Sequence, residues 1–174
     1  IKNGAMFSRI RDSDNIKECN YTTCYDMALL MRYAYSNKIY REINSKIIHK
    51  FESKNGKIYV FSTKHKLIKN NDFCVAGKTG YTKLASRTLV SLFKKDDKTI
   101  IVVTMDCSND WEVHKTLANY FFDNFEMYLF MKQGIIDIDD TSYPYVPFIY
   151  EDIIYPLREE ERLKVNVHLY KISN

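Results

Sequence analysis

Three strand-like segments, closely spaced along the chain, constrain its fold more than any other feature. They cover residues 73–79, 87–94 and 99–105. The last two are separated only by residues 95–98, Lys-Asp-Asp-Lys, a tight charged turn of the kind that joins antiparallel neighbours. The sequence therefore predicts an antiparallel sheet in the middle of the chain.

Helical patterns lie on both sides of these strands. Thr23, followed three residues later by Asp26, forms an acidic version of the capping box that begins a helix. One apolar face then recurs at helical spacing, made of Met27, Leu30, Met31 and Ala34. A short second helix is predicted over residues 38–44, and a long one over 109–132 that Gly134 ends. This mixture of helices and strands indicates an α/β or α+β fold.

A hairpin and a connection lie between the first helices and the strands. Strand-like residues on either side of Asn55-Gly56 predict a hairpin over residues 47–61. Asn-Gly suits a two-residue turn in which both residues have positive φ. Residues 64–72 are predicted to form a polar connection into the first strand of the sheet.

The chain changes character after residue 134. Residues 143–147, Tyr-Pro-Tyr-Val-Pro, have the composition of a linker, and short β-like runs follow at 148–150 and 163–169. These runs are too short to close a core of their own. We therefore predict two parts, with the main domain in residues 1–134 and a linker and the beginning of a β-rich domain in residues 135–174.

Composition excludes several classes of protein. A chain of 174 residues, 45% hydrophobic and 28% charged, is globular and long enough for one domain with an appendage. Its net charge of +4 is interspersed with acidic residues, which favours a solvated surface over a nucleic-acid groove. No segment reaches the length of a membrane span. The four cysteines lack metal-ligand spacing, so no zinc site and no cofactor are expected.

The histidines give no sign of a site either. They show no spacing that would bring two of them to a shared ligand, and all are predicted to lie at the surface: His49, His65, His114 and His168.

One short motif carries chemical information, the Gly-Lys-Thr-Gly of residues 77–80. One interpretation is the end of a phosphate-binding loop, which requires another glycine five residues before the first glycine of this motif. Asp72 stands there instead. A phosphate loop must also lead into a helix, whereas residues 86–93 form a strand-like run. The phosphate-loop interpretation therefore fails on both counts.

The other interpretation rests on the surrounding sequence. Residues 21–30, Tyr-Thr-Thr-Cys-Tyr-Asp-Met-Ala-Leu-Leu, resemble a helix start in the serine D-alanyl-D-alanine carboxypeptidases. These are low-molecular-weight penicillin-binding proteins in which a Lys-Thr-Gly strand lines the active site. Further matches to that family lie at residues 41–43, 67–68, 86–90, 99–103 and 109–111. The resemblance covers about residues 20–130 well and continues more loosely over 146–171, although the family usually has alanine in place of Cys24 and often histidine in place of Asn20.

The resemblance implies a fold and an activity. The fold would be the C-terminal part of a β-lactamase/transpeptidase-like domain, an antiparallel sheet flanked by helices, followed by the start of a small β-domain. The protein would remove the terminal D-alanine from peptidoglycan pentapeptides in the cell envelope, outside the membrane, and it would bind β-lactams. No cofactor is implied.

The resemblance also assigns residues to roles. Lys78 and Thr79 would anchor the carboxylate at the end of the substrate. Gly80 would let the acyl chain lie close to the strand, and the backbone N–H of Tyr81 would contribute to the oxyanion hole. Arg87, on the neighbouring strand, is a further candidate for supporting the carboxylate.

The nucleophile of the family is not found where the resemblance requires it. A serine three residues before a lysine on one helix face, and a separate Ser-x-Asn loop, should both precede the Lys-Thr-Gly strand. Ser91 and Lys94 have the first spacing, but they follow the motif in a predicted strand, where such residues point to opposite faces. Residues 13–15, Ser-Asp-Asn, have the second spelling but lie just before the first helix. We expect neither to be catalytic.

We therefore expect the nucleophile in a segment before Ile1, because a chain that begins with isoleucine is a processed or partial product. Without that N-terminal half the isolated chain should be inactive, because it lacks the nucleophile. One face of its sheet should also expose apolar surface that requires a partner or causes aggregation. A peripheral membrane contact through that half or a C-terminal segment is compatible with the resemblance. The rival hypothesis is a non-catalytic fragment or degenerate relative that binds peptidoglycan or a protein partner. A β-lactamase is a third, which the C-terminal β-like extension disfavours.

Overall fold

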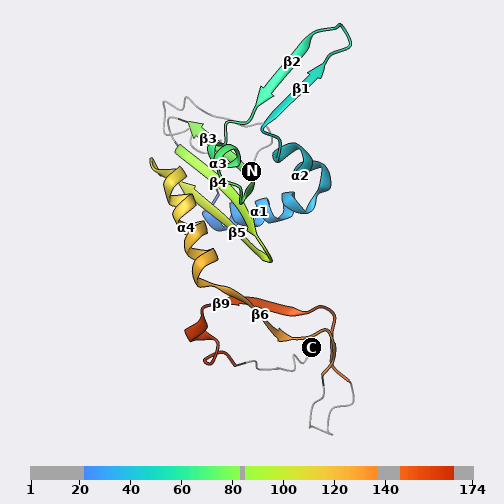
Figure 1. The fold of residues 1–174 in the computed structure, drawn as a ribbon, viewed down its shortest axis with the longest axis vertical. Helices are drawn as coiled ribbons and strands as arrows, with labels where there is room; N and C mark the ends of the chain where they lie inside the picture. Colours follow the sequence, from blue (N-terminus) through green and yellow to red (C-terminus); the bar gives the residue numbers. More distant parts are fainter. Residues whose placement is uncertain (1–21, 83–84, 137–145, 167–174) are drawn as a thin grey trace, which may run out of the picture. The chain divides into compact units, whose positions relative to one another are not determined.

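The computed structural model describes residues 22–82, 85–136 and 146–166 (Figure 1). The chain divides into two compact units, with the boundary between Tyr120 and Phe121. Each unit is described by itself below. The predicted division of the whole protein into domains, after residue 134, stays a prediction.

The first unit contains the predicted antiparallel sheet. Its strands β3 (Cys74–Thr82), β4 (Ser86–Lys95) and β5 (Lys98–Met105) lie in that order. Lys95 pairs directly with Lys98, so only two residues form the turn between β4 and β5. The three predicted strands and their tight turn are confirmed.

Two helices precede the sheet, as predicted. Helix α1 (Cys24–Ser36) begins with the expected capping box: Thr23 Oγ1 accepts from the Asp26 N–H at 3.1 Å, and Asp26 Oδ2 accepts from the Thr23 N–H at 3.3 Å. These bonds satisfy backbone donors that a helix start leaves unpaired. Helix α2 (Lys38–Asn44) follows directly, because the side chain of Asn37 caps its first turn.

The core of this unit lies on both faces of the sheet. On one face, Met31 of α1 packs with Ala76, Val90 and Leu92. Side chains alternate along a strand, so Ser91 points to the opposite face. There it bonds to a histidine of helix α4 (Asp110–Asn124). The sheet is therefore covered by α1 on one face and by the first turns of α4 on the other.

The hairpin β1 (Ile48–Glu52) and β2 (Ile58–Ser62) forms where it was predicted, but its turn is longer. The Ser53 N–H bonds the Lys57 carbonyl, and the Gly56 N–H bonds the Ser53 carbonyl, both at 2.9 Å. Only Gly56 takes a positive φ, of 78°. The predicted two-residue Asn-Gly turn is wrong, because the backbone bonds of Ser53 close a larger loop.

Residues 64–72 are not simply a polar connection. They contain the short helix α3 (Lys66–Asn70), which His65 caps through its side chain. Leu67 and Ile68 are buried, so burial of two adjacent apolar residues drives this turn of helix onto β3.

The prediction of one helix over residues 109–132 is also wrong in its second half. Helix α4 ends at Asn124, and strand β6 (Glu126–Met131) follows. Strand β6 pairs with β9 (Ile153–Leu157), and this long-range pairing overrides the helical spacing of the aromatic residues. Gly134 does not end a helix; it lies at φ 144° in β7 (Gly134–Ile135).

The second unit holds the remaining short strands. Strand β7 pairs with β8 (Phe148–Ile149), within the predicted run at 148–150. The predicted run at 163–169 is not a strand in its described part: a 3-10 helix, η2 (Glu159–Glu161), leads into a turn, and Leu163 is 95% exposed. Residues 143–145 and 167–169 lie outside the described residues. Across the described ranges, no helix is long and apolar enough to cross a membrane.

Candidate active site

The Lys-Thr-Gly motif lies on the outer strand of the sheet. Among the described residues β3 pairs only with β4, with Lys78 opposite Val90 and Gly80 opposite Thr88. The Gly77 N–H points away from β4 and donates to Asn44 Oδ1 of α2 at 2.7 Å. Backbone groups of an antiparallel strand alternate between its two edges.

This alternation fixes where the next amides point. The register between β3 and β4 is regular from Ala76 to Thr82, so the N–H groups of Thr79 and Tyr81 lie on the same open edge as that of Gly77. The side chain of Tyr81 is 69% exposed. Among the described residues no second strand pairs with this edge, so the N–H groups of Thr79 and Tyr81 face a side of β3 to which an extended peptide could add.

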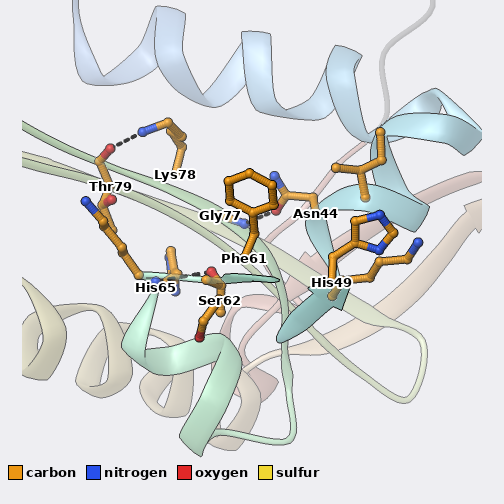
Figure 2. A pocket seen from close by; sticks show the side chains of 12 residues that line it. Asn44, His49, Phe61, Ser62, His65, Gly77, Lys78 and Thr79 are labelled. Carbon is orange, nitrogen blue, oxygen red and sulfur yellow. Dashed lines mark hydrogen bonds between the residues drawn. The ribbon is translucent and has the colours of Figure 1, made fainter. Parts of the chain in front are cut away.

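A cavity of about 460 Å³ lies beside this edge (Figure 2). Helix α2, the hairpin and β3 all contribute to its wall, with Asn44, His49, Phe61, His65, Lys78 and Thr79 among the lining residues. The Lys78 ammonium donates to the Thr79 carbonyl, as the dashed line in Figure 2 shows. The exposed lysine therefore extends along the open edge and not into the core.

Arg87 is held by a carboxylate. It lies opposite Tyr81 on β4, and its guanidinium donates to both oxygens of Asp110, at 3.1 and 2.6 Å. This hydrogen bond raises the pKa of Arg87. The Asp110 side chain is 3% exposed and that of Arg87 42%, so the pair holds the start of α4 against β4. Any role of Arg87 in binding a carboxylate must share its charge with Asp110.

The prediction that the histidines lie at the surface is wrong for two of them. His65 is 2% exposed and His114 is fully buried. Both bond to the hydroxyl of Ser91, His114 through Nδ1 at 2.8 Å and His65 through Nε2 at 3.1 Å. His49 is exposed, as predicted, and His168 lies outside the described residues. The three partners are 23 and 26 residues apart in sequence, so no local spacing could have revealed the cluster.

These two histidines should make the protein less stable in acid. The pKa of His114 is lowered from 6.5 to about 4, mainly by burial and also by nearby His65, while Asp110 opposes the shift. Burial also lowers the pKa of His65. Between pH 6.5 and about 4 the unfolded chain then binds more protons than the folded one. The stability that the neutral rings contribute is therefore complete above pH 6.5 and is lost as the pH falls towards 4.

Urea unfolding at several pH values tests this expectation. The free energy of unfolding should fall between pH 6.5 and 4, and His114→Gln, which keeps hydrogen-bonding groups but removes the titrating ring, should make that fall shallower. Carboxylates away from this site contribute equally in both proteins, so the difference between the two curves reports His114 together with its interactions with His65 and Asp110. Identical slopes would contradict the assignment.

Of the two sequence patterns that resemble a nucleophile motif, the structure describes one, and that one does not form a nucleophile. Ser91 and Lys94 lie on β4, and Ser91 is fully buried beneath α4. Residues 13–15 lie outside the described residues. Among the cysteines, Cys24 is exposed, Cys107 is half-buried, and burial raises the pKa of Cys74 to about 12. Within the described ranges, no cluster of three or more histidine, cysteine, aspartate or glutamate side chains could hold a metal ion.

An antiparallel sheet between two helices, with a Lys-Thr-Gly strand at its edge, defines a domain of the β-lactamase/transpeptidase-like class. The family model described as D-alanyl-D-alanine carboxypeptidase matches residues 10–109, more than half of the chain. The chain belongs to this family.

Solved structures agree on the fold. A D-alanyl-D-alanine carboxypeptidase from Mycobacterium tuberculosis is 23% identical, with a TM-score of 0.55 over 59% of this chain and 40% of that one. A mutant of the Streptomyces K15 DD-transpeptidase is 21% identical, with a TM-score of 0.55 over 60% of this chain and 44% of that one. Penicillin binding protein 6B from Escherichia coli is 18% identical, with a TM-score of 0.59 over 80% of this chain and 40% of that one. No curated protein sequence matches significantly.

These matches also show how much of a relative the chain represents. It spans 40 to 44% of the length of the three solved structures. The predicted family and fold class are confirmed, whereas the activity of the whole protein is a separate question.

Proposed function

We propose that this chain supplies the substrate-binding strand of a serine D-alanyl-D-alanine carboxypeptidase. The observation that carries the proposal is the outer edge of β3, where Lys78 and Thr79 line a cavity of about 460 Å³ and no further described strand pairs with β3. The substrate would be the pentapeptide of peptidoglycan, and β-lactams would bind at the same place. Action on peptidoglycan would locate the protein in the cell envelope, outside the membrane.

The chemistry of the edge suits a peptide that ends in a carboxylate. An extended peptide can add to an exposed sheet edge through main-chain hydrogen bonds. The Lys78 ammonium and the Thr79 hydroxyl would then give its terminal carboxylate a charge-assisted anchor. Gly80 has no side chain to hold the peptide away from the strand, and Thr88 Oγ1 lies only 2.3 Å from where a Cβ would be.

Catalysis would proceed by acyl transfer to a serine. The serine oxygen attacks the carbonyl carbon of the penultimate D-alanine, the C–N bond breaks, and the terminal D-alanine leaves with a proton delivered to its amine. Water then hydrolyses the acyl-enzyme and regenerates the serine. The Tyr81 N–H, on the open edge, would stabilise the oxyanion in both steps. Arg87 would add positive charge near the carboxylate, less than Lys78 does because Asp110 offsets it.

The serine and its lysine base would lie in a segment that precedes this chain. None of the described helices contains serine three residues before lysine, and the spacing must lie on a helix to bring the two side chains together. The short strands of the second unit would begin a β-rich domain. The same lack of a nucleophile fits the rival hypothesis, a non-catalytic relative that binds peptidoglycan or a protein partner.

Labelling with a fluorescent penicillin separates these hypotheses. The full-length protein and the 174-residue chain are each incubated with the probe, denatured, and examined by gel and intact mass. Label on the full-length protein only, blocked by excess unlabelled penicillin, is the expected result. Release of D-alanine from a pentapeptide would then establish the reaction. Label on the short chain would place the nucleophile within it, and label on neither would favour the non-catalytic relative.

A further inference from the structure

A chain of four hydrogen-bonded polar side chains, three of them buried, runs beneath the candidate site. It connects His65 at the start of α3, Ser91 on β4, His114 on α4 and Thr104 on β5. The two rings and the Ser91 hydroxyl are at most 2% exposed. Buried polar groups of this kind are costly unless each is hydrogen-bonded, and here each is.

One hydrogen bond from the backbone fixes the tautomer of His65. The Ile68 N–H donates to His65 Nδ1 at 3.4 Å, so that nitrogen is the acceptor and Nε2 carries the hydrogen. That single hydrogen lies near two acceptors, Ser91 Oγ at 3.1 Å and the Val90 carbonyl at 3.2 Å. One consistent arrangement then has the Ser91 hydroxyl donate to His114 Nδ1 at 2.8 Å and His114 Nε2 donate to Thr104 Oγ1 at 3.0 Å. Every group is satisfied with both rings neutral, in agreement with the lowered pKa of each.

One end of this chain touches the Lys-Thr-Gly strand. His65 Nε2 lies 3.2 Å from the carbonyl of Val90, the residue that pairs with Lys78 across the ladder. That carbonyl points towards β3, because the neighbouring Arg87 and Leu89 carbonyls point to β5 by the alternation of the strand. The His65 donor therefore reaches the same carbonyl that the Lys78 amide faces.

The same ring also fills the space over the preceding residue. A Cβ on Gly77 would lie 2.1 Å from His65 Nε2. His65 thus contacts the strand immediately before Lys78 and the carbonyl opposite it. Ser91 cannot itself be a nucleophile with these histidines, since it is fully buried and lines none of the described cavities.

We propose that His65 is a positioning residue, which holds the backbone at Lys78 in place for substrate binding and acylation through its bond to the Val90 carbonyl. The inference rests on the proposed function of that strand. The links from Ser91 to His114 and Thr104 keep the His65 ring in one orientation, so its donor always faces β3.

Two substitutions of His65 distinguish its hydrogen bond to the Val90 carbonyl from its capping of helix α3. Glutamine places an N–H near the position of Nε2, and asparagine places an oxygen near the position of Nδ1. His65→Gln therefore keeps a donor for Val90 and loses the cap of α3, whereas His65→Asn keeps a cap and loses the donor. Both are made in the full-length protein.

Two quantities are measured separately with the fluorescent penicillin. They are the dissociation constant of the reversible complex and the rate constant of the acylation step that follows. His65→Asn should slow acylation at least about tenfold, since small displacements of binding groups cost rate, and His65→Gln should stay within about threefold of the wild type. Amide hydrogen exchange at Lys78, followed in parallel, should accelerate in His65→Asn and not in His65→Gln.

The inference would be overturned if His65→Gln slowed acylation or accelerated hydrogen exchange more than His65→Asn does. It would also be overturned if both variants lost acylation rate equally and in proportion to their loss of stability in urea. If the wild-type protein takes no label, the proposed function fails. Hydrogen exchange at Lys78 then decides by itself whether His65 holds the strand.

Discussion

Lys78→Met in the full-length protein should reduce the second-order rate constant for penicillin acylation at least about a hundredfold, or about 2.7 kcal/mol. Methionine retains most of the aliphatic length of the side chain but removes the ammonium that would pair with the carboxylate of the substrate or drug. In the variant, that carboxylate would be desolvated on the edge of β3 without the ammonium that pairs with it, and removing one partner of a desolvated ion pair is costly.

The control is another lysine of the same unit. Lys69 in α3 is exposed and lines none of the described cavities, so Lys69→Met should leave acylation unchanged. Equal urea stability of the two variants would exclude unfolding as the cause of any loss. A Lys78→Met protein that reacts with penicillin as fast as the wild type would contradict the assignment of the anchor.

Gly77→Ala should destabilise the first unit more than any other single methyl group added to β3. The new Cβ would lie 2.1 Å from His65 Nε2 and 2.6 Å from the Val90 carbonyl oxygen. The second contact is with backbone, so relief requires the strands to separate. Overpacking of this kind costs about 1–3 kcal/mol and sometimes more. We expect a value at the upper end, measured by urea unfolding of the full-length protein.

Gly80→Ala is the matched control on the same strand. Its Cβ would lie 2.3 Å from Thr88 Oγ1, while the other atoms are no closer than 3.7 Å. The Thr88 hydroxyl is the end of a side chain that can rotate away, so the cost should be below about 1 kcal/mol. If the two variants lose equal stability, the carbonyl of Val90 is not the obstacle that the geometry implies.

The features that the sequence predicted correctly are those that depend on a few adjacent residues. The capping box of Thr23 and Asp26 and the two-residue turn between β4 and β5 each need only local bonds. The Lys-Thr-Gly motif could likewise be placed on a strand, because the strands around it have a clear pattern. Its chemical roles came from the family resemblance and stay predictions.

The features that sequence missed depend on residues far apart in the chain. The end of α4 at Asn124 is set by the pairing of β6 with β9, about thirty residues later. His65 and His114 look like surface residues until folding brings both to Ser91. The Asn-Gly hairpin turn failed for a different reason, since Ser53 offered the backbone a competing bond.

The packing around Gly77 bears on how short motifs are recognised in other sequences. Gly-Lys-Thr also occurs in phosphate-binding loops, where glycine lets the backbone approach an anion. Here glycine is required because a Cβ would collide with both the His65 ring and the Val90 carbonyl oxygen. The same Gly-Lys-Thr sequence thus occurs for two unrelated physical reasons. The residue that contacts the glycine distinguishes the two cases, and in this chain that residue is His65, twelve positions before Gly77.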